Sequence, residues 1–212
     1  MTIQENLKSI VTSIPKSVTL VAVSKTKPLI DIQEAYNAGQ RVFGENKVQE
    51  LVLKAEKLPK DIEWHLIGHL QKNKVKYIAP FVSLIHGVDS FQTLKEINKQ
   101  AKKHDRIINC LLQAKISKEE TKFGLSFSGI DQILNSDEFK DLKNIKIIGL
   151  MGMASFTKNV EQITKEFKSL KTFFDSTNLI TLSMGMSGDY KLAINEGSTM
   201  IRVGSAIFGS RL

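Results

Sequence analysis

Short apolar runs rich in β-branched residues alternate along this chain with longer stretches in which apolar residues recur at helical spacing. Such alternation is typical of a parallel sheet with helical crossovers, because helices cover the strands and the strands read as nearly continuous apolar runs. We expect strands in about eight places, at residues 18–23, 41–44, 62–67, 84–87, 107–114, 146–150, 179–182 and 200–203. Amphipathic stretches that we expect to be helices lie between them, at residues 29–38, 47–58, 91–104, 129–134 and 159–176.

A further helix is expected at residues 3–14, before any strand and before the break at Pro15, so it should cap or flank the sheet. No Gly/Ser-rich or low-complexity linker divides the chain. About eight strand–helix units in one uninterrupted chain fit a closed (β/α)8 barrel better than an open doubly wound sheet. We therefore expect an α/β fold in which residues 1–212 form one TIM-type barrel domain with an extra N-terminal helix.

The composition is that of an ordinary globular protein, with 42% hydrophobic and 25% charged residues, which excludes a disordered or collagen-like chain. The formal charge of +8 favours anions such as phosphates near the surface. The lysines are spread along the chain and arginine is scarce, whereas nucleic-acid binders gather their cations, so we expect no nucleic-acid partner. Salt-sensitive retention on DNA or RNA would indicate the opposite.

The single cysteine, Cys110, lies in an apolar run and is interpreted as a buried structural thiol. The N-terminus has no basic-then-apolar signal pattern, and no apolar stretch approaches the ~20 residues that cross a bilayer. We expect a cytoplasmic protein without a membrane partner.

The first candidate site residue is Lys25, which follows an apolar strand directly. In strand geometry Lys25 shares a face with Val21 and Val23, so if those two point into the barrel, the amine points into its mouth. Desolvation there would lower the pKa of the amine and free it for Schiff-base formation with an aldehyde. The plainer alternative is a surface lysine at a strand end, and Lys27 is the nearest rival.

The last two expected strands also end in suggestive residues. Arg202 interrupts an otherwise apolar run, and a guanidinium buried there requires a hydrogen-bond partner. Gly204 and Ser205 follow as a small-residue turn that opens a short helix, and Ser187 follows the preceding strand. In barrels the loops after the seventh and eighth strands often bind phosphate, which favours a phosphate site here. The alternative is that Ser187 and Asp189 merely cap a helix.

The histidines give a weaker signal. His65 and His69 have the spacing of a metal-binding pair on a helix, but Leu66 rather than Glu follows the first, and the segment reads as a strand entering a loop. We expect no zinc site, and we interpret His86 and His104 as ordinary polar residues.

Six motifs, in this order, closely resemble the pyridoxal phosphate homeostasis protein family. They are AVSKTKP at 22–28, FGEN at 43–46, WHLIGHLQ at 64–71, GLM at 149–151, GMS at 185–187 and GSAIFG at 204–209. Together they cover essentially the whole chain after the first helix, which makes the set far more specific than any one motif.

The resemblance implies a barrel similar to the N-terminal domain of alanine racemase, with pyridoxal 5′-phosphate held as an internal aldimine on Lys25. It also implies where the cofactor is held: its phosphate at Ser187, Gly204 and Ser205, its pyridine nitrogen at Arg202, and its ring beside Asn46 and Met151. Ser205 replaces the threonine that is commoner in the family but keeps a hydroxyl.

A charged guanidinium at Arg202 disfavours protonation of the ring nitrogen and so weakens the electron sink that carbanion chemistry needs. The chain also ends at Leu212, without the second domain that supplies the opposing tyrosine in alanine racemases. We therefore expect a monomeric carrier in intracellular vitamin B6 homeostasis that passes the cofactor to apo-enzymes. The alternatives are a one-base amino-acid racemase and a barrel aldolase that uses Lys25 without a cofactor.

Overall fold

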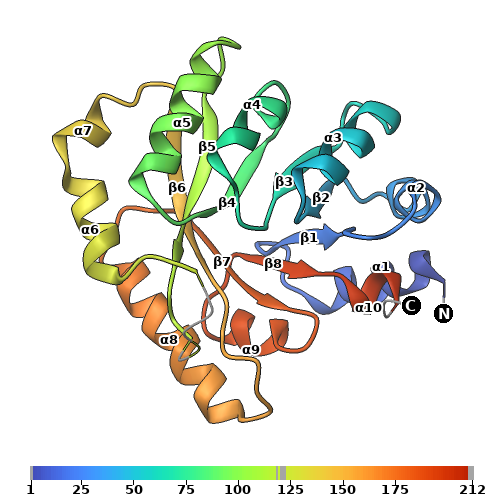
Figure 1. Cartoon of the computed structure of the whole chain (residues 1–212). Coiled ribbons are helices and arrows are strands. Elements are labelled where there is room, and N and C mark those ends of the chain that lie inside the picture. The colour runs from blue at the N-terminus through green and yellow to red at the C-terminus, as the bar shows by residue number, and fades with distance from the viewer. Residues whose placement is uncertain (1, 118, 120–122, 210–212) are drawn as a thin grey trace.

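Eight parallel strands close into a barrel in the order of the chain, with β8 hydrogen-bonded to β1 (Figure 1). The structure is a computed structural model that describes residues 2–117, 119 and 123–209. The strands are β1 (Thr19–Val23), β2 (Val42–Glu45), β3 (Glu63–Leu66), β4 (Leu84–Val88), β5 (Ile108–Ala114), β6 (Ile145–Gly152), β7 (Thr181–Met186) and β8 (Met200–Val203). The expected closed (β/α)8 barrel is confirmed, and β6 and β7 continue further toward their carboxyl ends than predicted.

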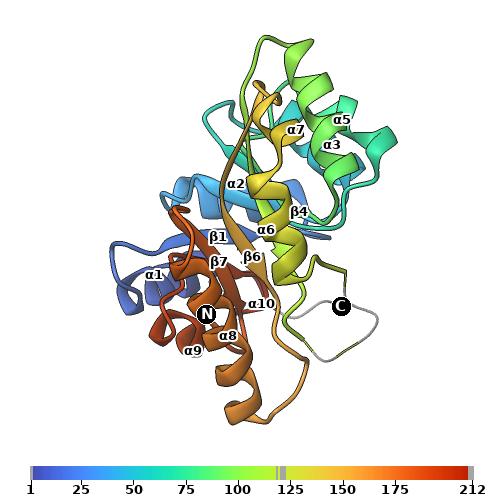
Figure 2. The ribbon, with the colours of Figure 1, turned by 90° about the vertical axis from the view of Figure 1, so that its left-hand side faces the viewer.

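Helices surround the strands, as Figure 1 shows from one end and Figure 2 from the side. They are α1 (Ile3–Ser13), α2 (Leu29–Asn37), α3 (Val48–Lys57), the 3-10 turn η1 (Lys72–Lys74), α4 (Val75–Ile78), α5 (Phe91–Lys102), α6 (Phe127–Asn135), α7 (Asp137–Lys140), α8 (Val160–Asp175), α9 (Tyr190–Asn195) and α10 (Ser205–Phe208). The sequence analysis missed η1, α4 and α7, because one turn of helix is too short to show a helical period. No helix in the described part of the chain is both long and apolar enough to span a bilayer.

Alternate residues of each strand face opposite sides of the barrel wall. Leu20 and Ala22 of β1 belong to the large apolar core between strands and helices. Val21 instead belongs to a small apolar cluster that fills the interior of the barrel. The other buried members of this interior cluster come from four further strands: Leu84, Leu111, Met151 and Met200.

Helix α1 flanks the barrel beside α10, as expected (Figure 1). A reciprocal capping box between Thr2 and Glu5 begins the helix. The side-chain amide of Asn6 donates a 3.0 Å hydrogen bond to the carbonyl oxygen of Ile207, which ties α1 to α10.

Cys110 is fully buried in β5, and burial raises the pKa of its thiol. This agrees with the structural role predicted for it.

Candidate functional site

The loops after β7, β8 and β1 meet at one mouth of the barrel, because these three strands are neighbours in the closed sheet. Ala22 of β1 lies opposite Val203 of β8, and Arg202 of β8 lies opposite Met186 of β7. In parallel strands all carboxyl ends lie at the same side, so residues that directly follow these positions are close in space.

Lys25 is half-buried and lies two residues beyond the end of β1. Val21 of β1 faces the barrel interior, and Lys25 follows it by four positions, in the turn directly beyond the strand. The alternative lysine, Lys27, points its amine toward α10. Its Nζ donates a 2.9 Å hydrogen bond to the carbonyl oxygen of Phe208.

The Ser187 hydroxyl lies against the turn between β8 and α10. Its Oγ accepts hydrogen bonds from the backbone nitrogens of Gly204 (3.1 Å) and Ala206 (3.4 Å). Ser187 therefore joins the two serine-bearing loops instead of capping α9. Asp189 occupies the N-cap position of α9, yet its Oδ1 accepts from Met186 N at 2.6 Å.

Gly204 lies close against the end of β1. A Cβ atom on Gly204 would lie 3.2 Å from the carbonyl oxygen and 3.3 Å from Cβ of Val23. These distances are tighter than ordinary van der Waals contact, so a larger residue here would require Val23 to shift. The donors of the turn consequently lie beside the chain segment that carries Lys25.

Arg202 is 3% exposed and points inward from β8, on the same side as Met200. Its guanidinium donates to Ser183 Oγ at 2.6 Å, to the Ser183 carbonyl at 2.8 Å and to the Gly152 carbonyl at 3.0 Å. The hydrogen-bond partners expected for this buried cation are thus present, and all three are neutral. Burial lowers the pKa of Arg202 to about 10, so the side chain stays charged at neutral pH.

Two buried histidines, His86 and His65, extend the hydrogen bonds of Arg202 and Ser183 across the barrel. His86 Nδ1 lies 3.1 Å from Ser183 Oγ, and His86 Nε2 lies 3.1 Å from His65 Nδ1. Arg202 is always a donor, so Ser183 Oγ accepts from it and gives its own proton to His86 Nδ1. His86 then carries its proton on Nε2 and donates to His65.

Burial keeps both of these histidines neutral. It lowers the pKa of His65 to about 3, and it lowers the pKa of His86 well below its usual value, with His65 and Arg202 adding to the effect. Every hydrogen bond in the Arg202–Ser183–His86–His65 chain therefore points away from the guanidinium.

The sequence analysis treated His86 as an ordinary polar residue and did not select Ser183. The signal that could have found them is that both, like His65, interrupt apolar strands on the inward face. His69 is separate from this chain, since its Nδ1 lies 2.9 Å from Asp89 Oδ2 and its ring stacks on Phe123.

Three further candidates lie at this mouth, and one of them, Ser205, is the exposed first residue of α10. Met151 is 1% exposed near the end of β6, within the cluster that fills the barrel interior. Asn46 is half-buried directly after β2, and a Cβ atom on Gly68 would lie 2.4 Å from its carbonyl oxygen. The seven predicted site residues thus come from strand ends that share one face of the barrel.

The chain as a whole is similar to several known proteins. The family model of the alanine racemase N-terminal domain matches residues 1–212. The pyridoxal phosphate homeostasis protein of Aquifex aeolicus is 39% identical over 199 residues, which cover 91% of this chain and 86% of the relative. PipY of Synechococcus elongatus, solved with pyridoxal phosphate (PLP) bound, has a TM-score of 0.89 at 36% identity and covers 98% of this chain and 100% of its own.

An alanine racemase of Clostridium difficile shows the likeness at the level of the fold. Its TM-score is 0.81 at 12% identity, and the match covers 99% of this chain but 57% of the racemase.

Proposed function

The chain belongs to the pyridoxal phosphate homeostasis protein family, and from this premise we propose that it binds pyridoxal 5′-phosphate as a Schiff base on Lys25 and holds it for intracellular vitamin B6 homeostasis. The observation that supports the proposal most is that the Lys25 segment and the serine-bearing turn after β8 lie at the same mouth of the barrel. The Lys25 segment lies beside a turn whose amide groups converge with the Ser187 hydroxyl.

The residues present fit the chemistry of this cofactor. Its phosphate needs several hydrogen-bond donors. The amides of Gly204 and Ala206, which donate to Ser187 Oγ in this structure, would turn to the phosphate together with the hydroxyls of Ser187 and Ser205. No cation is needed in the turn itself, because backbone amides and hydroxyls bind phosphate oxygens well. We propose Asn46 and Met151 as neighbours of the ring.

The covalent step uses the Lys25 amine in its neutral form. The amine nitrogen would attack the aldehyde carbon, a carbon–nitrogen double bond would replace the carbon–oxygen double bond, and the oxygen would leave as water with the two hydrogens of the amine.

Arg202 limits what the bound cofactor can do. Bound pyridoxal phosphate supplies an electron sink for carbanions when its ring nitrogen is protonated. A charged guanidinium beside that nitrogen would repel the proton, and the groups that Arg202 contacts directly are neutral. We therefore propose that the protein holds the cofactor and does not catalyse a reaction with it.

The proposed role in holding the cofactor leads to further proposals about its recipients, the oligomeric state and the cellular location of the protein. Because an incoming amine can replace Lys25 by transimination, we propose apo-enzymes that need the cofactor as recipients. Transfer faster than spontaneous dissociation supports delivery, and equal rates contradict it. We further propose that residues 1–212 act as a single-domain monomer in the cytoplasm without a nucleic-acid or membrane partner, which sedimentation and cell fractionation test.

The experiment compares the Lys25→Ala variant with Lys27→Ala as its matched control, by titrating pyridoxal phosphate and recording visible absorbance. The proposal predicts the absorbance of a lysine adduct for wild type and Lys27→Ala but not for Lys25→Ala. An adduct that persists in Lys25→Ala and disappears in Lys27→Ala contradicts it. A chiral assay on a panel of amino acids tests the racemase alternative, which predicts turnover that Lys25→Ala abolishes.

A further inference from the structure

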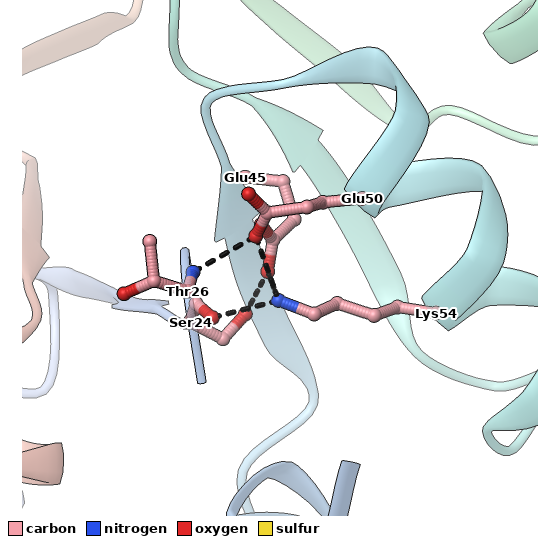
Figure 3. A network of polar contacts seen from close by, with 5 residues as sticks. All are labelled: Ser24, Thr26, Glu45, Glu50 and Lys54. Atoms are coloured by element: carbon pink, nitrogen blue, oxygen red, sulfur yellow. Dashed lines mark hydrogen bonds and ion pairs between the residues drawn. The ribbon is translucent and has the colours of Figure 1, made fainter. Parts of the chain in front are cut away.

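The two residues that flank Lys25 are both held by helix α3 and the end of β2 (Figure 3). On one side, Lys54 Nζ donates to the Ser24 carbonyl oxygen at 2.8 Å. On the other side, Thr26 N donates to Glu50 Oε2 at 2.8 Å. The backbone is thus fixed immediately before and immediately after Lys25.

Three charged side chains connect these two anchors, and we call Glu45, Glu50 and Lys54 the α3 clamp. Lys54 Nζ lies 2.8 Å from Glu45 Oε1 and 3.3 Å from Glu50 Oε2. Ser24 Oγ also donates to Glu45 Oε1, at 2.6 Å. Figure 3 shows the clamp residues converging on the amine of Lys54.

The α3 clamp lies outside the barrel, behind Lys25. Glu45 shares the strand face of Phe43, which packs in the core between strands and helices. Val21 of β1, by contrast, faces the inside of the barrel. The clamp therefore contacts the Lys25 segment from the helix side, at backbone atoms of Ser24 and Thr26.

Two of the three side chains of the α3 clamp are buried. The side chains of Lys54 and Glu45 are 5% and 0% exposed. A buried ion pair is weak evidence for a stabilising role, because desolvation offsets much of the attraction. Glu45 Oε2 even lacks a hydrogen-bond partner among the described residues. Apolar residues of α3, such as Val48 and Leu51, already anchor the helix.

The α3 clamp also restrains the backbone conformation of Thr26. Its φ of 65° lies in the left-handed region, which is uncommon for a threonine. Such a conformation persists only where the surroundings hold it, and it is frequent at functional sites. The hydrogen bond from Thr26 N to Glu50 is one such restraint.

We propose that the α3 clamp is a positioning device that aims the Lys25 amine into the barrel mouth. The inference rests on the proposed function, in which Lys25 holds the cofactor. Fixing the backbone on both sides of Lys25 fixes the direction of its Cα–Cβ bond and confines the amine near the phosphate-binding turn. Confinement of this kind raises the effective concentration of a reacting group.

The test measures the rate at which pyridoxal phosphate dissociates from wild type and three single variants, with borohydride reduction and peptide mapping of the adduct. Glu50→Ala removes the acceptor for Thr26 N, Glu50→Gln keeps an acceptor there, and Glu56→Ala makes the same change at an exposed position of α3. We expect dissociation roughly tenfold faster in Glu50→Ala, because a charge-assisted hydrogen bond is lost. Glu50→Gln should lie closer to wild type, and Glu56→Ala should match it.

Peptide mapping separates positioning from a merely structural role. The inference predicts that Glu50→Ala places part of the adduct on Lys27, which a loss of stability alone would not do. The double variant Glu45→Gln/Lys54→Met removes both buried charges together and should shift the adduct further. The Glu50 variants keep the test decisive where the double variant does not fold.

Equal dissociation rates and equal maps in Glu50→Ala and Glu56→Ala overturn the positioning role, while an adduct on Lys25 in wild type leaves the proposed function standing. A wild-type protein without an adduct on Lys25 overturns the proposed function and the inference with it.

Discussion

The hydroxyl oxygen of Ser187 lies 3.1 Å from the backbone nitrogen of Gly204, which bridges the loops after β7 and β8. The bridge brings a side-chain hydroxyl and backbone amides together beside the end of β1. These groups are neutral donors, so their interaction with a phosphate depends on geometry more than on net charge.

Replacing Ser187 by alanine tests this phosphate site. We expect Ser187→Ala to weaken binding of pyridoxal 5′-phosphate roughly tenfold, because one hydrogen bond to a charged group is lost. Pyridoxal, which has the aldehyde but no phosphate, should bind wild type and variant alike. Isothermal titration calorimetry with both compounds measures the difference, and equal losses for both would mean that Ser187 does not contact the phosphate.

Removing the guanidinium of Arg202 should destabilise the barrel. Arg202→Met leaves two buried carbonyl oxygens and the Ser183 hydroxyl without their donor. Each unsatisfied buried acceptor costs about 1–3 kcal/mol, so we expect the free energy of unfolding to fall by about 3 kcal/mol or more. Urea unfolding measures the loss. Arg202→Lys keeps one donor group and should lose less, and equal stability of Arg202→Met and wild type would show that these contacts contribute nothing.

Because His65 and His86 are buried in neutral form, we expect the free energy of unfolding to depend on pH. The pKa of His65 is lowered from 6.5 to about 3 in the folded protein, so the unfolded state binds more protons below pH 6.5. Stability should be fully present above pH 6.5 and should fall as the pH is lowered toward 3, by up to about 1.4 kcal/mol per pH unit for one such group.

Urea unfolding between pH 5 and 7 measures this slope while most carboxylates stay ionised. His65→Gln keeps a polar side chain but does not titrate, so its slope should be smaller than that of wild type. Identical slopes would show that His65 is not buried as a neutral group.

The barrel was predictable from the sequence because its strands are short apolar runs at regular spacing, and the same pattern placed Lys25 and Arg202 at strand ends. The need of Arg202 for partners was also predictable from its apolar surroundings. The partners themselves were not, because the carbonyls of Ser183 and Gly152 come close only when the sheet closes. No local pattern marks a backbone acceptor.

The α3 clamp was unpredictable for a related reason. Glu45 lies on a strand and Lys54 on the following helix, nine residues apart in sequence, so neither strand nor helix spacing connects them. Their pairing depends on how α3 packs on the barrel.

The most direct test of the central claim is reduction of the wild-type protein with borohydride after it has been loaded with pyridoxal 5′-phosphate, followed by peptide mapping. The account predicts one reduced pyridoxyl adduct per chain, on Lys25. An adduct on Lys27 or another lysine, or no adduct at all, would contradict it.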